Sequence, residues 1–228
     1  MKDLIVAATY LELAPFLNHI GYTKIVAQAE IVDFGKFDLL ITGIGQTQTT
    51  FSITRAITKG RYSCLLNFGI AGSFKKKTPI RSMVIVAEEI FADLGAENND
   101  GEFLDLFEMG LNDANKHPFK DGKLQALIPE SFTSAQHLPK VRSVTVNRVL
   151  SHANSIKWVE KKYAPDVVNM EGAAVFYACI MSELPCLQLR TISDFVGTRD
   201  KASWDIKGAV ETLNQEVIRI YEQRYKLS

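Results

Sequence analysis

Short apolar runs alternate along this chain with segments whose apolar residues repeat at helical spacing. Runs of strand length lie at 4–8, 23–28, 30–34, 38–42, 63–68, 82–91, 141–146 and 186–193. Helical patterns lie at 10–20, 46–59, 148–162, 171–183 and 205–224. Strands that alternate with helices favour parallel pairing, with the helices packed on the sheet. The pattern therefore predicts an α/β fold with a mostly parallel, twisted central sheet flanked by helices.

The length and charge of the chain narrow its organisation and its partners. Its 228 residues fit a single domain over 1–228, and its 26 basic residues balance its 26 acidic ones. A neutral chain has no electrostatic reason to bind nucleic acid or an anionic membrane. The apolar run at 4–8 is too short for a signal peptide or a membrane span, so we expect a cytoplasmic protein. The four histidines lack metal-ligand spacing, and we expect neither a metal nor a cofactor.

Two segments rich in small residues follow predicted strands. The first is Gly-Ile-Gly at 43–45, and the second is the turn predicted at 67–73. The first lacks the third glycine of a dinucleotide fingerprint, because Gln48 stands there. Small residues let the backbone approach a ligand closely, which makes Ala71 and Gly72 candidate binding residues. Tight packing between strand and helix would explain either segment equally well.

Three acidic residues stand where a predicted strand ends or a helix begins: Glu12, Glu171 and Asp194. Ligands of α/β proteins bind at the carboxyl ends of strands, so we expect these side chains to share a site. Each acid alone also fits an ordinary role, as a solvated, helix-starting or turn residue. Together they provide what cleavage of a glycosidic bond requires: an acid for the leaving group, a carboxylate for water, and negative charge near a cation-like transition state.

Two motifs connect these acids to a known family. Met-Glu-Gly-Ala-Ala at 170–174 and Arg-Thr-Ile-Ser-Asp at 190–194 resemble the two C-terminal signatures of the nucleoside phosphorylase/nucleosidase superfamily. The small-residue segments at 43–45 and 67–72 occur in the matching order, and the resemblance spans essentially the whole chain. It implies a nucleoside phosphorylase-like fold, a small-molecule nucleoside substrate and an N-glycosidase activity.

The resemblance also implies a role for each motif residue. Asp194 resembles the general acid that protonates N7 of the departing purine. Glu12 resembles the residue that holds and deprotonates the attacking water, with Arg190 supporting it. Glu171 resembles the carboxylate that accepts hydrogen bonds from the ribose 2′ and 3′ hydroxyls, and Met170 resembles the side chain packed under the sugar.

The base-binding region is less closely matched by the sequence. Val146 and Asn147 correspond to the strand end that contacts the base in the superfamily. Adenine-nucleoside hydrolases usually carry a serine near the water in the segment equivalent to 67–72, where this chain has Ile70. We therefore expect either another group to orient the water or a pocket shaped for a different substrate.

Two further segments resemble the futalosine hydrolase branch of the superfamily. They are 91–97 (Phe-Ala-Asp-Leu-Gly-Ala-Glu) and 199–206 (Arg-Asp-Lys-Ala-Ser-Trp-Asp-Ile). The resemblance implies release of hypoxanthine from futalosine, a step of menaquinone biosynthesis, with Arg199 and Lys201 as candidates for the carboxylated tail. Three alternatives stay open: a methylthioadenosine/S-adenosylhomocysteine nucleosidase, a nucleoside phosphorylase and a non-catalytic nucleoside-binding protein. The absence of arginine between Gly45 and Arg55 makes phosphorolysis less favoured.

The segment 92–123 differs from the rest of the chain. It is rich in acidic residues, glycine and asparagine and shows no clear periodicity. Long irregular insertions in compact domains often serve as lids or interfaces, although a solvated loop is an equally good interpretation. Members of the superfamily assemble as dimers or larger, so we expect a homo-oligomer in which this loop-rich insertion could complete a neighbouring pocket.

Overall fold

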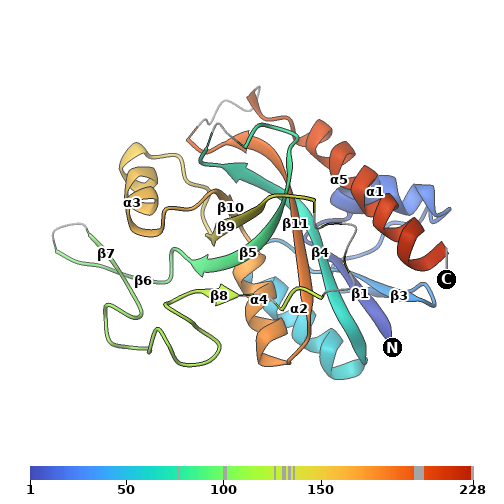
Figure 1. Cartoon of the computed structure of the whole chain (residues 1–228), viewed down its shortest axis with the longest axis horizontal. Helices are drawn as coiled ribbons and strands as arrows, with labels where there is room; N and C mark the ends of the chain where they lie inside the picture. The colour runs from blue at the N-terminus through green and yellow to red at the C-terminus, as the bar shows by residue number, and fades with distance from the viewer. Residues whose placement is uncertain are drawn as a thin grey trace.

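A computed structural model describes residues 1–75, 78–99, 102–125, 127–129, 132, 135, 137–197 and 203–226. Its centre is a sheet with the strand order β10-β9-β5-β11-β4-β1-β3-β2, and β8 pairs with β5 (Figure 1). The strands of this sheet are β1 Lys2–Ala7, β2 Ile31–Asp33, β3 Phe37–Ile41, β4 Tyr62–Ser73, β5 Met83–Phe91, β8 Leu124–Gln125, β9 Lys140–Thr145, β10 Val167–Asn169 and β11 Cys186–Phe195. The helices are α1 Tyr10–His19, α2 Gln46–Lys59, α3 Ala153–Tyr163, α4 Gly172–Met181 and α5 Ile206–Tyr221, which continues into a π-helical turn, Glu222–Lys226.

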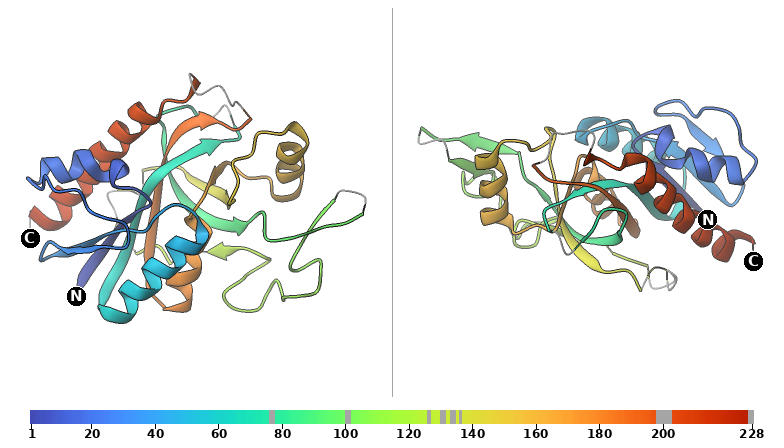
Figure 2. Two further views of the ribbon diagram at one scale, coloured as in Figure 1. Left: turned by 180° about the vertical axis from the view of Figure 1, so that it is seen from behind. Right: turned by 90° about the horizontal axis from the view of Figure 1, so that it is seen from above.

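The sheet is mixed and partly closed, which corrects the prediction of a mostly parallel sheet. The pairs β1–β3, β1–β4, β4–β11, β5–β9 and β9–β10 are parallel. The pairs β5–β11, β4–β10, β2–β3 and β5–β8 are antiparallel. Because β10 pairs with both β9 and β4, five strands form a closed, barrel-like ring (Figure 2). The periodicity of apolar residues indicates that strands exist but carries no information on their direction. The α/β class was therefore predictable from the sequence, whereas the closure of the ring was not.

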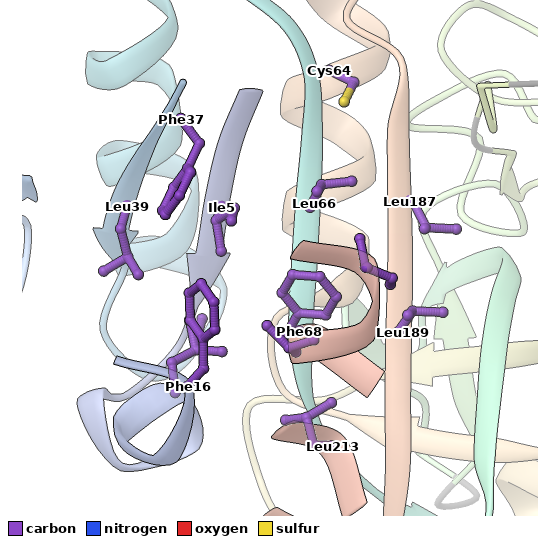
Figure 3. Close-up of a cluster of buried hydrophobic side chains, with 14 of the residues drawn as sticks. Ile5, Phe16, Phe37, Leu39, Cys64, Leu66, Phe68, Leu187, Leu189 and Leu213 are labelled. Atoms are coloured by element: carbon purple, nitrogen blue, oxygen red, sulfur yellow. The ribbon is translucent and has the colours of Figure 1, made fainter. Parts of the chain in front are cut away.

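The sheet is covered on both faces, as its nearly continuous apolar strands require. On one face, α1 and α5 pack on each other and cover the central strands, and Phe16 and Leu213 contact the cluster built on Leu66 and Phe68 (Figure 3). On the other face, α2 and α4 pack together over a second apolar cluster (Figure 1). This double cover fixes the strands rigidly, and their carboxyl ends carry the functional side chains described below.

Three predicted elements differ from the structure. The run 23–28 is not a strand, and only Gln28 forms an isolated bridge. The helix predicted from 148 begins at Ala153. The turn predicted at 67–73 lies within β4, because β4 continues to Ser73 and there pairs with β10 as well as β11. The extra length of β4 is what closes the ring.

The described part of the insertion 92–123 extends away from the sheet and contains the hairpin of β6 (Gly95–Glu97) and β7 (Phe103–Asp105) (Figure 1). It contacts α3, where the rings of Phe103 and Trp158 lie 4.9 Å apart and Lys162 lies 3.0 Å from Asp105. Within the described residues, no helix is long and apolar enough to cross a membrane.

Candidate active site

A cavity of approximately 300 Å³ opens where β1, β4, β10 and β11 end. The three acids singled out in the sequence, Glu12, Glu171 and Asp194, all line it. They come from segments far apart in the chain, and the common edge of the sheet brings them together. Most of the remaining lining is apolar, which is typical of a site that binds a small organic ligand and excludes water.

Glu12 lies in the first turn of α1, directly after β1, and its side chain is 9% exposed. Its Oε2 accepts hydrogen bonds from the backbone N–H of Thr9 at 2.8 Å and the Thr9 hydroxyl at 3.0 Å, and its Oε1 accepts one from the N–H of Ile70 at 3.3 Å. Burial raises the pKa of Glu12, while these bonds and the positive charge of Arg190 act in the opposite direction. The carboxyl group is therefore fixed in place, and its hydrogen bonds offset only part of the free energy that its charged form loses on burial.

Arg190 lies behind Glu12 rather than in the cavity lining, and its side chain is 1% exposed. Its Nη2 donates to Asn67 Oδ1 at 2.6 Å. A Cβ on Gly69 would lie 3.0 Å from both Arg190 Nη1 and Glu12 Oε1, so the small residue lets the two charged groups approach the same stretch of β4. Burial lowers the pKa of Arg190, and the carboxylates of Glu171, Glu89 and Glu12 raise it.

Glu171 follows β10 and is the N-cap of α4. Its Oε1 accepts a hydrogen bond from the N–H of Gly45 at 2.9 Å, and its own N–H donates to Asn169 Oδ1 at 2.8 Å. Gly45 has a φ of +89°, a value that favours glycine, and it starts α2. The Gly-Ile-Gly segment thus presents a backbone N–H to an acid of the site.

Asp194 lies near the end of β11, just after a shift in the pairing register with β4. The Ser193 hydroxyl donates to Asp194 Oδ1 at 2.7 Å. Burial raises the pKa of Asp194, and the bond from Ser193 opposes this shift. A Cβ on Gly72 would lie 3.3 Å from Asp194 Oδ2, so the absence of a side chain at position 72 leaves room beside the carboxyl group.

The other candidate binding residues divide into two groups. Met170, Ala71, Gly72 and Val146 line the cavity. Asn147 is exposed and does not belong to the lining; its N–H and its Nδ2 donate to the Asp93 carboxylate at 2.5 Å and 3.3 Å. The structure therefore places Asn147 at the rim, where it joins the end of β9 to the start of the insertion.

Comparison with known proteins identifies the family. The sequence matches the phosphorylase superfamily over residues 4–223. The chain belongs to the phosphorylase superfamily. The futalosine hydrolase of Streptomyces coelicolor is 31% identical over 186 residues, which cover 79% of this chain and 77% of that relative. The 5′-methylthioadenosine/S-adenosylhomocysteine nucleosidase of Aeromonas salmonicida is 28% identical over 168 residues, 72% of this chain and 70% of that protein.

A solved structure agrees with this assignment at the level of the fold. The futalosine hydrolase of Helicobacter pylori superposes with a TM-score of 0.75 and 19% identity, covering 98% of both chains. At that identity the likeness shows a shared fold and nothing finer.

Sequence reasoning missed several apolar lining residues of this superfamily member: Leu11, Ile44, Val149, Leu150, Val168, Val196, Trp204, Ile206 and Val210. Ile206 and Val210 are four residues apart at the start of α5, so they share a helix face, and that spacing was the available signal. Leu11 lies in α1, Val168 lies in β10 and the others lie in loops. At none of these positions does the sequence distinguish an apolar lining residue from one that packs in the core. Ile70, at the position where adenine-nucleoside hydrolases are expected to carry a serine, also lines the cavity.

All charged residues of the cavity lining are acidic within the part of the chain that the structure describes. The lining includes three acidic residues and no lysine, arginine or histidine. Arg199 and Lys201, the candidates for the substrate tail, lie outside the described residues. No group of three or more histidine, cysteine or acidic side chains could hold a metal ion, as far as the described chain extends.

Proposed function

We propose that this enzyme hydrolyses the N-glycosidic bond of a purine nucleoside, with Asp194 as general acid, Glu12 as general base and Glu171 as the ribose-binding carboxylate. The observation that carries the proposal is the cavity itself: three acids from three separate elements line it, and none of its described lining residues is cationic. Negative charge around the sugar stabilises a cation-like transition state more than the neutral substrate, and such differential binding accelerates the reaction.

The environment of Asp194 suits a proton donor. A purine leaves readily once N7 is protonated, and an ordinary aspartate, with a pKa of about 3.9, carries no proton at neutral pH. Burial raises the pKa of Asp194, and a single side-chain hydrogen bond from Ser193 opposes that shift. This balance favours the protonated form that the role requires.

The environment of Glu12 suits a base that must accept a proton from water. Three hydrogen bonds and the charge of Arg190 all favour its ionised form against the effect of burial. Glu12 lies beside Gly69 and Asp194 beside Gly72 on the same strand. We expect inversion at the anomeric carbon, because carboxyl groups at separate positions along the strand leave room for a sugar and a water between the acid and the base.

Hydrolysis is favoured over phosphorolysis by the lack of a cationic group in the described lining. A phosphate nucleophile needs positive charge or several donors beside the sugar. The Gly45 N–H at the start of α2 is already bonded to Glu171, which removes one of the backbone donors there. Arg190 is fully buried and donates to Asn67 and to a backbone carbonyl.

We propose futalosine as the substrate, cleaved to hypoxanthine and dehypoxanthine futalosine. Support comes from the similarity to the Streptomyces coelicolor enzyme over 79% of the chain and from the segments 91–97 and 199–206. The sulfur-containing nucleosides methylthioadenosine and S-adenosylhomocysteine are the second candidates, because a relative named for them is 28% identical.

The test is a turnover assay in phosphate-free buffer with futalosine, methylthioadenosine, S-adenosylhomocysteine and inosine side by side, with free base detected by chromatography. We expect hypoxanthine from futalosine. Adenine from the sulfur nucleosides would keep the reaction and replace the substrate. Turnover only after phosphate is added would make the protein a phosphorylase, and binding without release of base would make it a non-catalytic nucleoside-binding protein.

We also propose that residues 1–228 work as one nucleosidase domain within a homo-oligomer, a dimer or larger, with the insertion 92–123 at the interface. The family match over residues 4–223 supports the first point. Leu11 and Ile44 at the cavity and nearby Phe51 on α2 are 72%, 54% and 63% exposed, which supports the second. Light scattering combined with rate measurements on dilution tests it, and a monomer that keeps its full specific rate would refute it.

A further inference from the structure

Glu89 is a fully buried carboxylate that the reaction described above does not use. It lies on β5 with 0% of its surface exposed, and it is not part of the cavity lining. The preceding residue, Glu88, has a partly exposed side chain that pairs with Arg142 on the outside of the sheet. Successive side chains of a strand point to opposite faces, so Glu89 points inward. Burial of a carboxylate is costly unless every oxygen is bonded, so its presence calls for an explanation.

The Glu89 carboxylate accepts three hydrogen bonds from three different strands. Asn169 Nδ2 on β10 donates to Oε1 at 2.7 Å, and Gln188 Nε2 on β11 donates to the same oxygen at 2.6 Å. The Thr145 hydroxyl on β9 donates to Oε2 at 2.8 Å. Glu89 therefore helps to orient two amides and a hydroxyl, and the Ser143 hydroxyl accepts a further hydrogen bond from Asn169 Nδ2 at 2.8 Å.

Two of these three side chains, Asn169 and Thr145, in turn hold the start of α4. Asn169 Oδ1 accepts hydrogen bonds from the N–H groups of Glu171 at 2.8 Å and Gly172 at 2.5 Å. Thr145 Oγ1 accepts one from the N–H of Ala173 at 2.8 Å. The first N–H groups of a helix have no partner within the helix, and here three in succession are bonded to side chains that Glu89 orients.

Gly172 completes this arrangement. A Cβ at position 172 would lie 1.8 Å from Glu89 Oε1 and 2.6 Å from Gln188 Nε2. Real side-chain atoms do not approach so closely, so the first turn of α4 sits directly on the buried carboxylate only because residue 172 has no side chain. The glycine of the Met-Glu-Gly motif thereby sets the position of the glutamate that precedes it.

We infer that Glu89 is a positioning residue for Glu171: through Asn169 and Thr145 it fixes the first turn of α4 and so aims the Glu171 carboxylate at the ribose hydroxyls. The inference rests on the proposed function, because it assigns Glu89 an effect on a nucleoside that Glu171 binds. The network begins inside the ring of strands and ends at the cavity, where Glu171 Oε1 also accepts a hydrogen bond from Gly45.

The first experiment compares Glu89→Gln with Glu88→Gln, a matched variant on the same strand whose side chain lies outside the network. For each variant, rates are measured with futalosine and with its 2′-deoxy analogue, or with the corresponding methylthioadenosine pair if the wild type prefers it. Misplacement of a positioned group by about 1 Å costs up to about 100-fold in rate. We expect Glu89→Gln to lower the ratio of ribonucleoside to deoxynucleoside rates by about tenfold or more. The reason is that a misplaced Glu171 loses its contact with the 2′ hydroxyl, which only the ribonucleoside has.

This ratio separates positioning from simple loss of folded protein. A variant that merely unfolds loses both rates in proportion and leaves the ratio unchanged, whereas a misaimed Glu171 affects the substrate with the 2′ hydroxyl more. Glu88→Gln should leave the ratio at the wild-type value. An unchanged ratio in Glu89→Gln would overturn the inference.

A reciprocal exchange provides the second test. Asn169→Asp alone places two carboxyl groups face to face and should reduce turnover strongly. In Glu89→Gln/Asn169→Asp the amide and the carboxylate change places, so a hydrogen bond between them re-forms and an oxygen of residue 169 still accepts from the N–H groups of Glu171 and Gly172. We expect the double variant to be faster than Asn169→Asp and to regain part of the rate ratio; a double variant slower than either single one would refute the relay.

The combination Glu89→Gln/Glu171→Gln completes the experiment. If Glu89 acts through Glu171, the double variant is no slower than Glu171→Gln alone, because coupled residues are not additive. Effects that multiply would show two independent roles and refute the inference while leaving the proposed function intact. A wild-type protein that releases no base from any nucleoside would refute the proposed function and with it the role assigned to Glu89.

Discussion

Two acids at opposite ends of the sheet, Asp3 and Asp194, are buried and partly buried respectively, and burial has different consequences for them. Asp3 is the second residue of β1 and is 3% exposed, and it accepts hydrogen bonds from Arg224, Tyr225 and two residues of β4. These donors outweigh burial and lower its pKa. Asp194 ends β11 beside the cavity, where burial outweighs the bond from Ser193 and raises its pKa.

The difference shows that the number of hydrogen-bond donors to a carboxyl group, and not burial alone, decides whether the group keeps its charge or can carry a proton. A carboxylate with all its hydrogen-bond sites satisfied holds its charge and fastens two parts of the chain together, as Asp3 fastens the C-terminal turn to β1. A carboxyl group with few donors can carry a proton at neutral pH. Glu12 stands between the two cases, with three hydrogen bonds and a nearby cation against complete burial.

The largest expected effect comes from Asp194→Asn. The amide keeps the size of the side chain and has no proton that it can transfer to N7, and general acid catalysis contributes about 10²- to 10⁴-fold. We expect kcat to fall by about that factor while the nucleoside still binds, as checked by single-turnover rates and by calorimetric titration. Near-normal turnover in this variant would remove Asp194 from the mechanism.

Glu12→Gln should produce the next largest loss. Water then lacks a group that accepts its proton, and the single amide oxygen can accept from only one of the two backbone N–H groups, Thr9 or Ile70, that bond the two carboxylate oxygens. We expect a decrease in kcat of about 10²-fold with a smaller change in KM, measured with the substrate that the wild type prefers. If the loss were confined to KM, Glu12 would be a binding group rather than a base.

The two raised pKa values predict a bell-shaped dependence of kcat/KM on pH. Glu12 must be ionised, so activity falls as pH decreases through its pKa, which burial has raised. Asp194 must be protonated in the free enzyme, so activity falls as pH increases through its own raised pKa. The residual activity of Glu12→Gln should lose the acidic limb and that of Asp194→Asn the basic limb. A profile that stays the same in both variants would contradict the assignment.

The sequence predicted the acids of the cavity but not the network beneath them. Glu12 and Glu171 follow a strand and Asp194 lies near the end of one, and parallel neighbours such as β1, β4 and β11 bring such positions to one edge. Glu89 gave no such signal, because its partners lie on β9, β10 and β11 and meet only after the ring closes. That closure depends on the antiparallel contact of β10 with β4, which hydrophobic periodicity does not encode.

The contacts of Asp3 with Arg224 and Tyr225 could not be predicted from the sequence either. Asp3 and Arg224 are 221 residues apart, and nothing in the local pattern around either residue indicates their pairing. The register of β1, by contrast, follows from its apolar residues, since Leu4 and Ile5 pack into the clusters on opposite faces of the sheet. Local patterns thus predict which residues are buried, whereas the partners of a buried charge depend on the complete topology.

Asp3→Asn tests the other side of the comparison and should affect stability without affecting turnover. Loss of one partner of a buried ion pair costs about 3 kcal/mol, measured as the free energy of unfolding in urea. Because the folded pKa of Asp3 is lowered, its contribution is complete above the unfolded value of about 3.9 and disappears as pH falls through the folded value. The gap between wild type and variant should therefore be constant from neutral pH to about 4 and narrow below it. A loss of kcat at 25 °C would show that the two ends of the sheet are coupled.

Glu88→Gln should have the smallest effect, and it isolates the contribution of burial. Glu88 is bonded to Arg142 at 2.8 Å and lies 3.8 Å from Lys123, but 23% of its side chain remains in contact with water. Ion pairs near the surface contribute about 1 kcal/mol or less, because water and salt screen them and the side chains lose entropy. We expect urea unfolding to shift by no more than about that amount and kcat to stay the same. A destabilisation as large as that of Asp3→Asn would mean that hydrogen-bond donors alone set how much each carboxylate contributes to folding stability. A small shift would show that such donors stabilise the protein strongly only where water is excluded.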